Sequence, residues 1–575
     1  MYLAGRTISR VFFPIQRFAL TTLARPIIRR EQRTSVVLTT LTTLLCGHTL
    51  GVSAAVPQPP TSDPSTVATP PAAPFPTSRP PSNFYIREYR VQGAHKLTKP
   101  EIEEAVYPYL GPGRTAEDVE RARATLEQAY KTKGYQTVSV EVPPQSASIG
   151  IVNLQVNETP VGRLRVKGSR YYSPRLIKQQ VPSLAEGTVP NFNAVTRDIV
   201  ALNQLPDRRI TPTLHAGIEP NTVDIDLNVT DTFPLHGSLE LNNRYSTGTS
   251  ELRLNGSVSY NNLWQQGHSV GFSFQVAPEN IDDAKVFSAY YLARIPDVDW
   301  LTFIAQGTKQ DSNVSTLGGA GVAGRGEIAG GRAVFSLPLG KDFYHSLTLG
   351  FDYKHYTQNL TVSGTEVLTP VTYYPFSIDY NATWTGKSGI TALDGSVIFN
   401  IRGIGSDEAE FDFNRFKASG NFFYFRGELS HTHELGAGWQ VSGRIQGQLA
   451  DGPLLSSEQF NGGGLTSVRG YLESEVLGDN GILGSLELSS PSLLSTASGR
   501  NEWRLYLFSE GGLLGLKDTL PGQDSQFSLA SIGAGTRIHL LNHFNGSLDL
   551  GVPLISQTDT QAWDLLLTFR VWADF

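Results

Sequence analysis

Apolar and polar residues alternate one by one along the C-terminal part of the chain. In residues 268–276 the apolar positions are Val270, Phe272, Phe274 and Val276. A period of two over segments of about ten residues is typical of strands that turn an apolar face to lipid and a polar face to a lumen. We count sixteen such segments, beginning near residues 237, 252, 268, 286, 300, 330, 346, 374, 391, 418, 438, 481, 501, 526, 543 and 563. The pattern predicts a 16-stranded transmembrane antiparallel β-barrel over residues 233–575.

A soluble β-sandwich is the alternative, but its strands are usually shorter. The lengths of the connections also distinguish the two folds. If the chain enters from the side of its N-terminal part, the turns that return there are short, at residues 296–299, 435–438 and 541–543. The opposite connections are long, at residues 309–329, 357–373 and 451–480. This asymmetry is typical of outer-membrane barrels. The last strand carries Phe569 and ends in Phe575, which we interpret as the closing signal that the barrel-assembly machinery reads.

Residues 83–232 show helical periods between short strands. In residues 83–158 we predict a strand at 86–91, helices at 99–110 and 115–133, and strands at 137–142 and 151–156. Thr98 and Thr115 stand at the N-cap positions and Gly134 closes the second helix. Residues 159–232 repeat the order, with a strand at 161–166, helices at 174–181 and 192–205, and strands at 210–214 and 223–229.

Two sequence matches support an internal repeat of this β-α-α-β-β unit. Residues 89–93 match 164–168, and residues 152–156 match 223–227. A match at a regular spacing over two places is the signature of a duplicated unit. A sheet edge beside a helix can add an extended peptide by backbone pairing, so we expect the repeats to bind polypeptide. The alternative is that they are structural spacers.

The first 82 residues contain no pattern of a folded domain. Residues 1–55 hold seven Arg and one acid, followed by an apolar run and small residues at Ala54 and Ala55, which predicts a cleaved export signal. A membrane helix is the alternative, but the apolar run is too short to span. Cys46 could carry a lipid, although Leu45 before it is bulky for such a site. Residues 56–82 are rich in proline and predict an extended linker.

Composition excludes several classes of function. Without residues 1–55, 40 basic and 52 acidic residues remain (47 − 7 and 53 − 1), which disfavours nucleic-acid binding. A single Cys cannot build a cysteine metal site. Gly319, Gly321 and Gly324 fit a dinucleotide motif but precede no predicted helix, and His431 and His433 have no evident third ligand. We expect no catalytic residue, cofactor or metal.

One long connection carries a recognisable motif. It consists of Glu458-Gln459-Phe460, Gly462-Gly463-Gly464, Ser467-Val468-Arg469-Gly470-Tyr471, Glu473, Gly478, Asp479 and Gly481. This motif resembles the sixth loop of the two-partner secretion transporters (TpsB, the haemolysin and filamentous-haemagglutinin secretion type), within the superfamily of outer-membrane assembly barrels. The resemblance covers residues 83–575 and implies two POTRA domains, at 83–158 and 159–232, before the barrel.

The resemblance also implies site residues. In the family the sixth loop, here 451–480, folds into the pore, and its Arg pairs with an acid on the inner wall of strand 13. The motif residues are Val468, Arg469, Gly470 and Tyr471, supported by Gly463, Gly464, Glu473, Asp479 and Gly481. In that strand Glu510 alternates with the residues expected to face lipid, so it faces the lumen and is the expected partner. The family more often has Asp at this position. The alternative is that Arg469 serves barrel stability alone.

The implied function is protein export across the outer membrane of a Gram-negative bacterium. The POTRA domains, in the periplasm, would capture a cognate secreted exoprotein of adhesin or haemolysin type, which passes the barrel unfolded. Lipids and lipopolysaccharide would surround the barrel. The alternative is an assembly factor that inserts other barrels, but such factors usually carry more POTRA repeats. A passive porin would leave the repeats unexplained.

Overall fold

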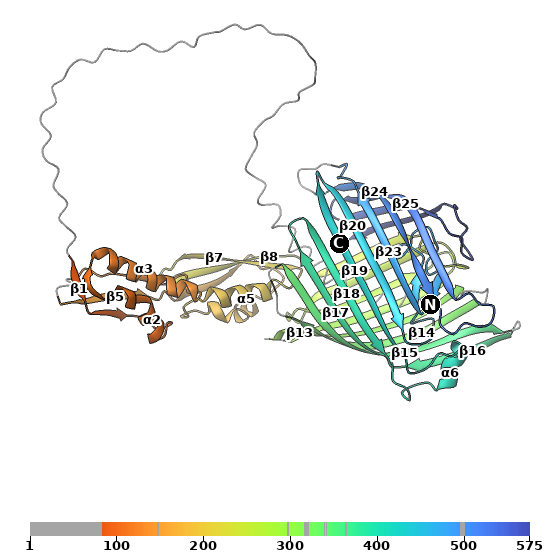
Figure 1. The fold of residues 1–575 in the computed structure, drawn as a ribbon, viewed down its shortest axis with the longest axis horizontal. Helices are drawn as coiled ribbons and strands as arrows, with labels where there is room; N and C mark the ends of the chain where they lie inside the picture. The colour runs from red at the N-terminus through yellow and green to blue at the C-terminus, as the bar shows by residue number, and fades with distance from the viewer. Residues whose placement is uncertain are drawn as a thin grey trace, which may run out of the picture.

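The structure consists of two small mixed units in a row, followed by a large barrel (Figure 1). It is a computed structural model and describes residues 83–145, 149–295, 298–315, 321–337, 340, 342–362, 365–494 and 501–575. The predicted export signal at 1–55 and linker at 56–82 lie outside these residues. Among the helices that the structure describes, none has both the length and the apolar character needed to cross a membrane.

The first unit is a three-stranded sheet, with a small two-stranded sheet beside it, packed against helices. Strand β2 is parallel to β5, and β4 is antiparallel to β5. The side chains of α3 that face the sheet, including Leu126 and Tyr130, are fully buried. The elements are β1 Phe84–Ile86, β2 Glu88–Gln92, α2 Lys99–Val106, a 3₁₀ turn at Tyr107–Tyr109, β3 Gly111–Arg114, α3 Ala116–Thr132, β4 Ser139–Glu141 and β5 Ile151–Asn157.

Local chemistry explains where these elements begin and end. Thr98 and Thr115 form capping boxes with the acids three residues later, as the sequence predicts. Helix α2 is shorter than predicted because Pro108 has no N–H to continue the α-helical bonds, so a 3₁₀ turn follows. The predicted first strand is divided at Arg87, whose N–H donates to Gly150 O (2.7 Å) instead of a neighbouring strand. Strand β3, which pairs with β1, was not predicted.

The second unit repeats the sheet, with β6 parallel to β8 and β7 antiparallel to β8. It joins the first unit closely, since Phe192 N–H donates to Gly134 O (2.8 Å) and Asn191 Nδ2 donates to Lys133 O (3.0 Å). The elements are β6 Val161–Lys167, α4 Pro174–Gln179, a 3₁₀ turn at Pro182–Leu184, α5 Phe192–Leu202, β7 Arg208–Ala216 and β8 Val223–Asp231.

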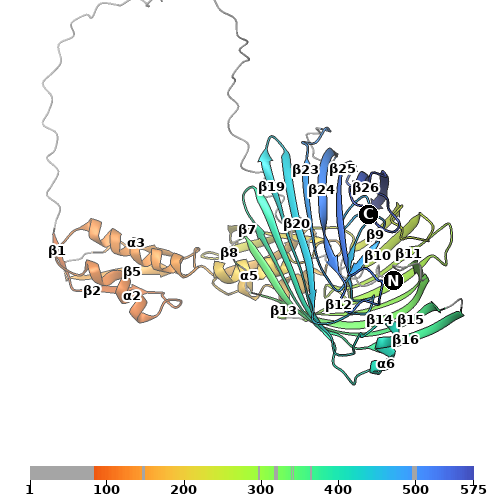
Figure 2. The same cartoon turned by 45° about the vertical axis from the view of Figure 1, so that its right-hand side comes forward.

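The barrel closes by pairing its last strand with its first. Strand β27 pairs with β9, and Phe575 exchanges two backbone hydrogen bonds with Gly237 (3.0 and 3.1 Å). Figure 2 shows the tilted strands side by side, with α6 and β16 at the end far from the small units. The strands are β9 Leu235–Asn242, β10 Arg253–Leu263, β11 His268–Val276, β12 Ala284–Ile295, β13 Val298–Ser315, β14 Gly321–Ser336, β15 Phe343–Val362, β16 Thr365–Tyr373, β17 Phe376–Thr385, β18 Gly389–Phe399, β19 Phe423–Gly436, β20 Trp439–Ala450, β23 Asn480–Ser489, β24 Glu502–Gly515, β25 Gln526–Leu540, β26 Phe544–Pro553 and β27 Leu566–Asp574.

The eighth strand is interrupted, which reconciles seventeen strand segments with a sixteen-stranded barrel. Both β16 and β17 pair antiparallel with β15. Pro375 stands at the break and has no N–H to donate, while Tyr374 N–H donates to Asn400 Oδ1 (3.0 Å). The predicted long loops at 309–329 and 357–373 are largely β-hairpin extensions of the barrel strands. Alternation could not identify them, because a strand beyond the membrane has no lipid to face.

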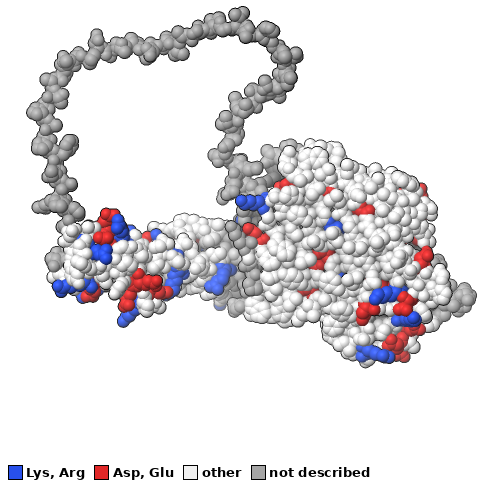
Figure 3. All heavy atoms as spheres, viewed as in Figure 1, with Lys and Arg blue, Asp and Glu red and all other residues white. Residues whose placement is uncertain are grey.

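The outer wall of the barrel is apolar. Figure 3 shows few charged residues on the visible wall, whereas charges gather on the small units and at the end near α6 (Glu408–Asn414). On β24 the exposed residues Trp503, Leu505 and Leu507 alternate with buried Tyr506 and Phe508. The parity predicted from the sequence is therefore confirmed on this strand, and its lumen face is the one that carries the candidate site.

Candidate functional site

The connection between β20 and β23 folds back into the barrel. It contains a short hairpin, β21 Phe460–Gly462 with β22 Val476–Gly478, and most of its residues are buried. Its side chains contact residues on β15 and β19 as well as on β24 and β26. We call residues 451–479 the pore loop.

Arg469 lies at the centre of a cluster of three carboxylates on the wall. Its backbone N–H donates to Glu510 Oε2 (2.6 Å), and its Nε and Nη2 both donate to Glu510 Oε1 (3.0 and 2.6 Å). Its Nη1 donates to Glu487 Oε2 (3.1 Å) and Asp549 Oδ1 (3.0 Å). The three acids come from β24, β23 and β26. The structure thus brings together Arg469 and Glu510, the pair expected from the sequence, and adds two acids that the sequence analysis missed.

Aromatic rings and a second cation complete this carboxylate cluster. The Arg469 guanidinium carbon lies 3.6 Å from the centre of the Phe508 ring. Arg537 binds Glu487 with two hydrogen bonds (2.6 and 2.9 Å) and lies 4.1 Å from the ring centre of Tyr506. Tyr506 in turn donates to Asp549 Oδ1 (2.7 Å). Two cations face three carboxylates, so removing Arg469 would leave buried negative charge with insufficient compensation.

The alternation of lipid-facing and lumen-facing residues alone could have identified Glu487 and Asp549. Glu487 stands between the exposed residues Leu486 and Leu488, and Asp549 stands between Leu548 and Leu550. Each acid therefore has the lumen-facing parity of its own strand. The family resemblance implies an acid only on strand 13, so it gives no reason to expect acids on the neighbouring strands.

Two features require glycine at position 470: its backbone conformation and the close approach of the barrel wall. Gly470 has φ of +93°, a left-handed conformation that favours glycine. A Cβ on Gly551 of the facing strand β26 would lie 2.6 Å from Gly470 Cα. Two glycines thus allow the backbones of loop and wall to meet. Gly463 and Gly464 also have positive φ, at +98° and +92°, in the turn that leads to the motif.

The neighbours of Arg469 in the motif are buried against the same wall. Val468 is fully buried, in one apolar cluster with Tyr471, Phe460 and Leu529. The Tyr471 hydroxyl lies 2.7 Å from Ile555 O and 3.0 Å from Ala530 O and is positioned to donate to them. This contact fixes the loop to the ends of β25 and β26.

Glu473 attaches the loop to the barrel seam. Its two carboxylate oxygens accept hydrogen bonds from Arg244 Nε (2.8 Å) and Nη2 (3.2 Å), just after the first strand. Its backbone N–H donates to Tyr245 O (3.0 Å). Glu475, which was not singled out from the sequence, accepts the backbone N–H of Thr560 (2.9 Å).

The two ends of the pore loop are held by buried carboxylates as well. Glu458 accepts hydrogen bonds from Lys354 Nζ (2.5 Å) and from the hydroxyls of Tyr373 (2.6 Å) and Tyr424 (2.7 Å). Asp479 is fully buried and accepts the backbone N–H of Lys517 (2.7 Å), among other donors.

Other predicted residues lie around this site. Gly481 lies in β23 against Phe460, and a Cβ on it would come within 2.7 Å of that ring. Phe569 lies in the closing strand β27, where its backbone N–H donates to Asn243 Oδ1 (2.7 Å), and Phe575 lies at the seam. His431 donates to or accepts from Thr391 Oγ1 (2.8 Å). Within the described residues, no group of three His, Cys, Asp or Glu side chains is placed to hold a metal ion.

Two family models match the chain. The model of the haemolysin secretion/activation protein ShlB/FhaC/HecB matches residues 221–538, more than half of the chain. The model of the ShlB-type POTRA domain matches residues 84–159. These matches agree with the two-part architecture of small units and barrel.

Individual relatives agree with the family model. The outer membrane transporter CdiB of Dickeya dadantii is 23% identical over 438 residues, which cover 71% of this chain and 72% of that protein. The structure of CdiB from Escherichia coli matches with a TM-score of 0.64 at 20% identity, covering 88% of this chain and 92% of that one. BamA from Haemophilus ducreyi, lacking POTRA domains 1–3, matches with a TM-score of 0.53 at 14% identity, covering 86% and 100%. At these identities the structural matches show the fold alone.

The family fixes the location and the general function. The barrel is an outer-membrane transporter of secreted proteins, and its two POTRA domains lie in the periplasm. The chain belongs to the haemolysin secretion/activation family of ShlB, FhaC and HecB, the transporters of two-partner secretion.

Proposed function

We propose that the pore loop is the gate of this transporter and that Arg469 is its latch. The observation that carries the proposal is the set of hydrogen bonds from Arg469 to three carboxylates on three different strands. The buried carboxylates Glu458, Glu473 and Asp479 hold the rest of the loop to the wall. A polypeptide that crosses the lumen must displace this loop, at least in part.

The contacts of Arg469 with the wall are strong, but a passing chain can break them. A buried ion pair gains little net stability over apolar packing, yet breaking it by removing one partner costs about 3–5 kcal/mol. A passing chain can displace the loop only if it supplies that energy. No nucleotide is available in the periplasm, so we infer that folding of the exported partner outside the cell supplies it.

The POTRA domains capture the unfolded partner by strand addition. In the second domain β7 pairs only with β8, so among the described strands its other edge is open. Strand β7 is nine residues long, and its last residues are exposed. Its open edge can add an extended peptide by backbone hydrogen bonds. Leu214, which is 39% exposed, gives such a peptide an apolar contact beside the edge.

The exported partner is of adhesin or haemolysin type and is unfolded in transit. Lipids and lipopolysaccharide surround the apolar wall, and the barrel-assembly machinery reads the closing strand that contains Phe569 and ends in Phe575. Residues 1–55 are an export signal, 56–82 a linker, and 83–158 and 159–232 the POTRA domains. The chain transports without catalysing a reaction.

Secretion by an Arg469→Ala variant tests the latch. We expect secretion of the partner to be abolished, because without Arg469 the pore loop cannot return to its place on the wall, while the barrel still folds and inserts. Arg332→Ala is the matched control, because Arg332 forms a partly buried pair with Asp352 (2.7 Å) in the wall and bonds to no pore-loop residue. Normal secretion by Arg469→Ala, or equal loss in both variants, would remove Arg469 from the mechanism.

A further inference from the structure

The connection between β18 and β19 contacts the pore loop at the outer end of the barrel. We call this connection, residues 400–422 with α6 in it, the α6 connection. Figure 2 shows α6 beside β16, at the end of the barrel far from the POTRA domains. Because those domains lie in the periplasm, the α6 connection lies on the outer side of the membrane.

Hydrogen bonds give the α6 connection a defined place against the wall. Asn400 Nδ2 donates to Gly420 O (2.7 Å), which joins the two ends of the connection to each other. Ser406 N–H donates to Thr372 O (2.7 Å) at the end of β16. The connection is thus attached to the eighth strand of the barrel as well as to β18 and β19.

A buried phenylalanine of α6 packs with the first part of the pore loop. Phe411 is 1% exposed and belongs to one apolar cluster with Leu454 and Leu455 of the pore loop. The centre of its ring lies 5.9 Å from that of Tyr373, whose hydroxyl binds Glu458 of the same loop. Moving this part of the loop away from α6 would therefore expose apolar surface to water, which is unfavourable.

An arginine of the α6 connection holds the other end of the pore loop. Arg415 Nη2 donates to Oδ2 of Asp479, the last residue of the loop (3.4 Å), and to Lys517 O (2.9 Å). Asp479 is fully buried, and in the described part of the chain Arg415 is the one cation paired with it. Removing one partner of a buried ion pair leaves an uncompensated charge, which is strongly unfavourable. Arg415 therefore stabilises Asp479 in its place.

Asp479 joins the two ends of the pore loop. Its Oδ1 accepts hydrogen bonds from Leu454 N–H (2.9 Å) and Gln459 Nε2 (3.0 Å) in the first part of the loop. Directly inside these ends β21 pairs with β22, from Phe460 with Gly478 to Gly462 with Val476. The base of the loop is thus a paired ribbon, so the loop can swing as one body only if its ends move.

The α6 connection reaches across the strands from which the pore loop departs. Lys417 Nζ donates to Asp518 Oδ1 (2.7 Å), in the connection between β24 and β25, and both side chains are exposed. In the barrel β20 and β23 lie between β19 and β24. The contacts of the α6 connection with residues 517 and 518 therefore span the outer ends of β20 and β23, where the pore loop begins and ends.

We propose that the α6 connection is an outer clamp on the gate and that Arg415 is the positioning residue that couples it to the pore loop. This inference rests on the proposed role of the pore loop as the gate. Arg469 holds the middle of the loop on the wall, whereas Phe411 and Arg415 hold its two ends from the outer side. The ends can move only after the α6 connection has moved, so opening of the pore requires both sets of contacts to break.

Single-channel conductance of the full-length protein in planar bilayers tests the role of Arg415. We expect Arg415→Ala to raise the frequency of openings roughly tenfold or more, because it removes two hydrogen bonds of a charged group. Arg415→Lys should largely restore the native frequency, since a single nitrogen of Arg415 makes both bonds and an ammonium group can replace it. Arg402→Ala is the matched control, because Arg402 lies in the same connection but pairs with Glu408 (3.2 Å).

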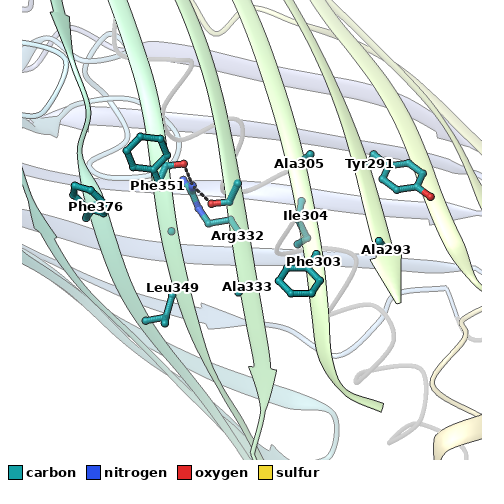
Figure 4. A pocket seen from close by; sticks show the side chains of 12 residues that line it. Tyr291, Ala293, Phe303, Ile304, Ala305, Arg332, Ala333, Leu349, Phe351 and Phe376 are labelled. Atoms are coloured by element: carbon teal, nitrogen blue, oxygen red, sulfur yellow. Dashed lines mark hydrogen bonds between the residues drawn. The ribbon is translucent and has the colours of Figure 1, made fainter. Parts of the chain in front are cut away.

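A second control tests for a general loosening of the barrel. Figure 4 shows Arg332 in the wall, beside an apolar hollow of about 510 Å³ that residues of β12 to β17 line. Arg332 donates to Phe351 O (3.2 Å) and Asp352 Oδ1 (2.8 Å), and its printed partners include no residue of the α6 connection. Arg332→Ala should therefore open as rarely as the native chain.

Cross-linking on intact cells tests whether the α6 connection must move. Lys417→Cys and Asp518→Cys are combined with Cys46→Ser, which removes the one native cysteine, and a bis-methanethiosulfonate reagent joins the two new thiols. We expect secretion to stop when the link forms and to resume when a reductant breaks it. The control is Arg402→Cys with Glu408→Cys, whose link joins the α6 connection to itself and should leave secretion unchanged.

The outcomes separate this inference from the proposed function. A native opening frequency in Arg415→Ala, or continued secretion by protein linked between positions 417 and 518, would overturn the clamp, and Arg469→Ala would still report on the gate. If Arg469→Ala conducts and secretes like the native chain, the gate is wrong and the clamp is wrong with it. Heat-modifiable gel mobility shows whether each variant has folded, and if Arg415→Ala does not fold, the linked pair alone decides.

Discussion

The pore loop and the junction of the second POTRA domain with the barrel are held by different kinds of contact. Arg469 has carboxylate partners from three strands, and every nitrogen of its side chain donates to one of them. At the junction Asp207 Oδ1 lies 2.6 Å from His236 Nε2, and Gln265 Nε2 donates to Tyr171 O (2.9 Å). Charged contacts from three strands thus converge on one side chain of the pore loop, whereas the junction is joined by single polar contacts from several residues. This difference supports Arg469 as a contact that the exported partner must break.

Loss of Glu510 should produce the largest effect at the gate. Glu510 accepts three of the hydrogen bonds of Arg469, including its backbone N–H. We expect Glu510→Ala to cost the loop contact about 3–5 kcal/mol and to abolish secretion. Glu510→Asp should retain secretion, because a carboxylate one methylene shorter can still reach the guanidinium. Secreted partner per folded barrel is the measurement, and equal secretion by both variants and the native chain would exclude Glu510.

Loss of Glu487 or Asp549 should weaken the latch less. Each accepts a single hydrogen bond from Arg469, so Glu487→Gln and Asp549→Asn should each cost about 1–2 kcal/mol. Partial secretion is the expected result. Limited proteolysis of the pore loop in purified protein checks it, with cleavage rates between those of the native chain and of Glu510→Ala. A rate as high as that of Glu510→Ala would show that the three acids act as one unit.

Tyr471→Phe should have a smaller effect. It removes the hydroxyl that contacts Ala530 O and Ile555 O but keeps the ring in its apolar cluster. We expect a loss of about 1 kcal/mol, visible as a modest increase in pore-loop proteolysis with secretion retained. A complete loss of secretion would mean that the hydroxyl does more than fix the loop.

The ion pair of Glu101 and Lys133 in the first POTRA domain should give the smallest effect. Its hydrogen bond from Lys133, together with those from Thr98, lowers the pKa of Glu101 from 4.5 to about 2. A lowered pKa stabilises the folded state at pH above 4.5, and this contribution is lost as the pH falls toward 2. We expect Lys133→Ala to reduce the thermal midpoint slightly at pH 7, and by less at pH 3. An equal reduction at both pH values would contradict the assigned cause.

Strands that contact lipid were predictable because the membrane dictates their alternation. On β24 that alternation identified the lumen side and with it Glu510. The hairpin extensions of β13 and β15 were not predicted, since no lipid imposes a pattern on them. The break before Pro375 depends on a single missing N–H, which a count of alternating residues does not detect.

The candidate site was predictable only in part, because a motif names residues of one segment and not their surroundings. The sequence indicated Arg469 and one partner, but the loop contacts residues just after β9 and on β15 and β26 that are distant in the chain.

Single-channel conductance of purified protein in planar bilayers tests the gate most directly. The experiment compares the native chain with Arg469→Ala and with the wall control Arg332→Ala. We predict that Arg469→Ala opens to a larger conductance, or opens more often, because the pore loop leaves the wall, and that Arg332→Ala behaves like the native chain. If Arg469→Ala conducts like the native chain, Arg469 does not hold the gate closed.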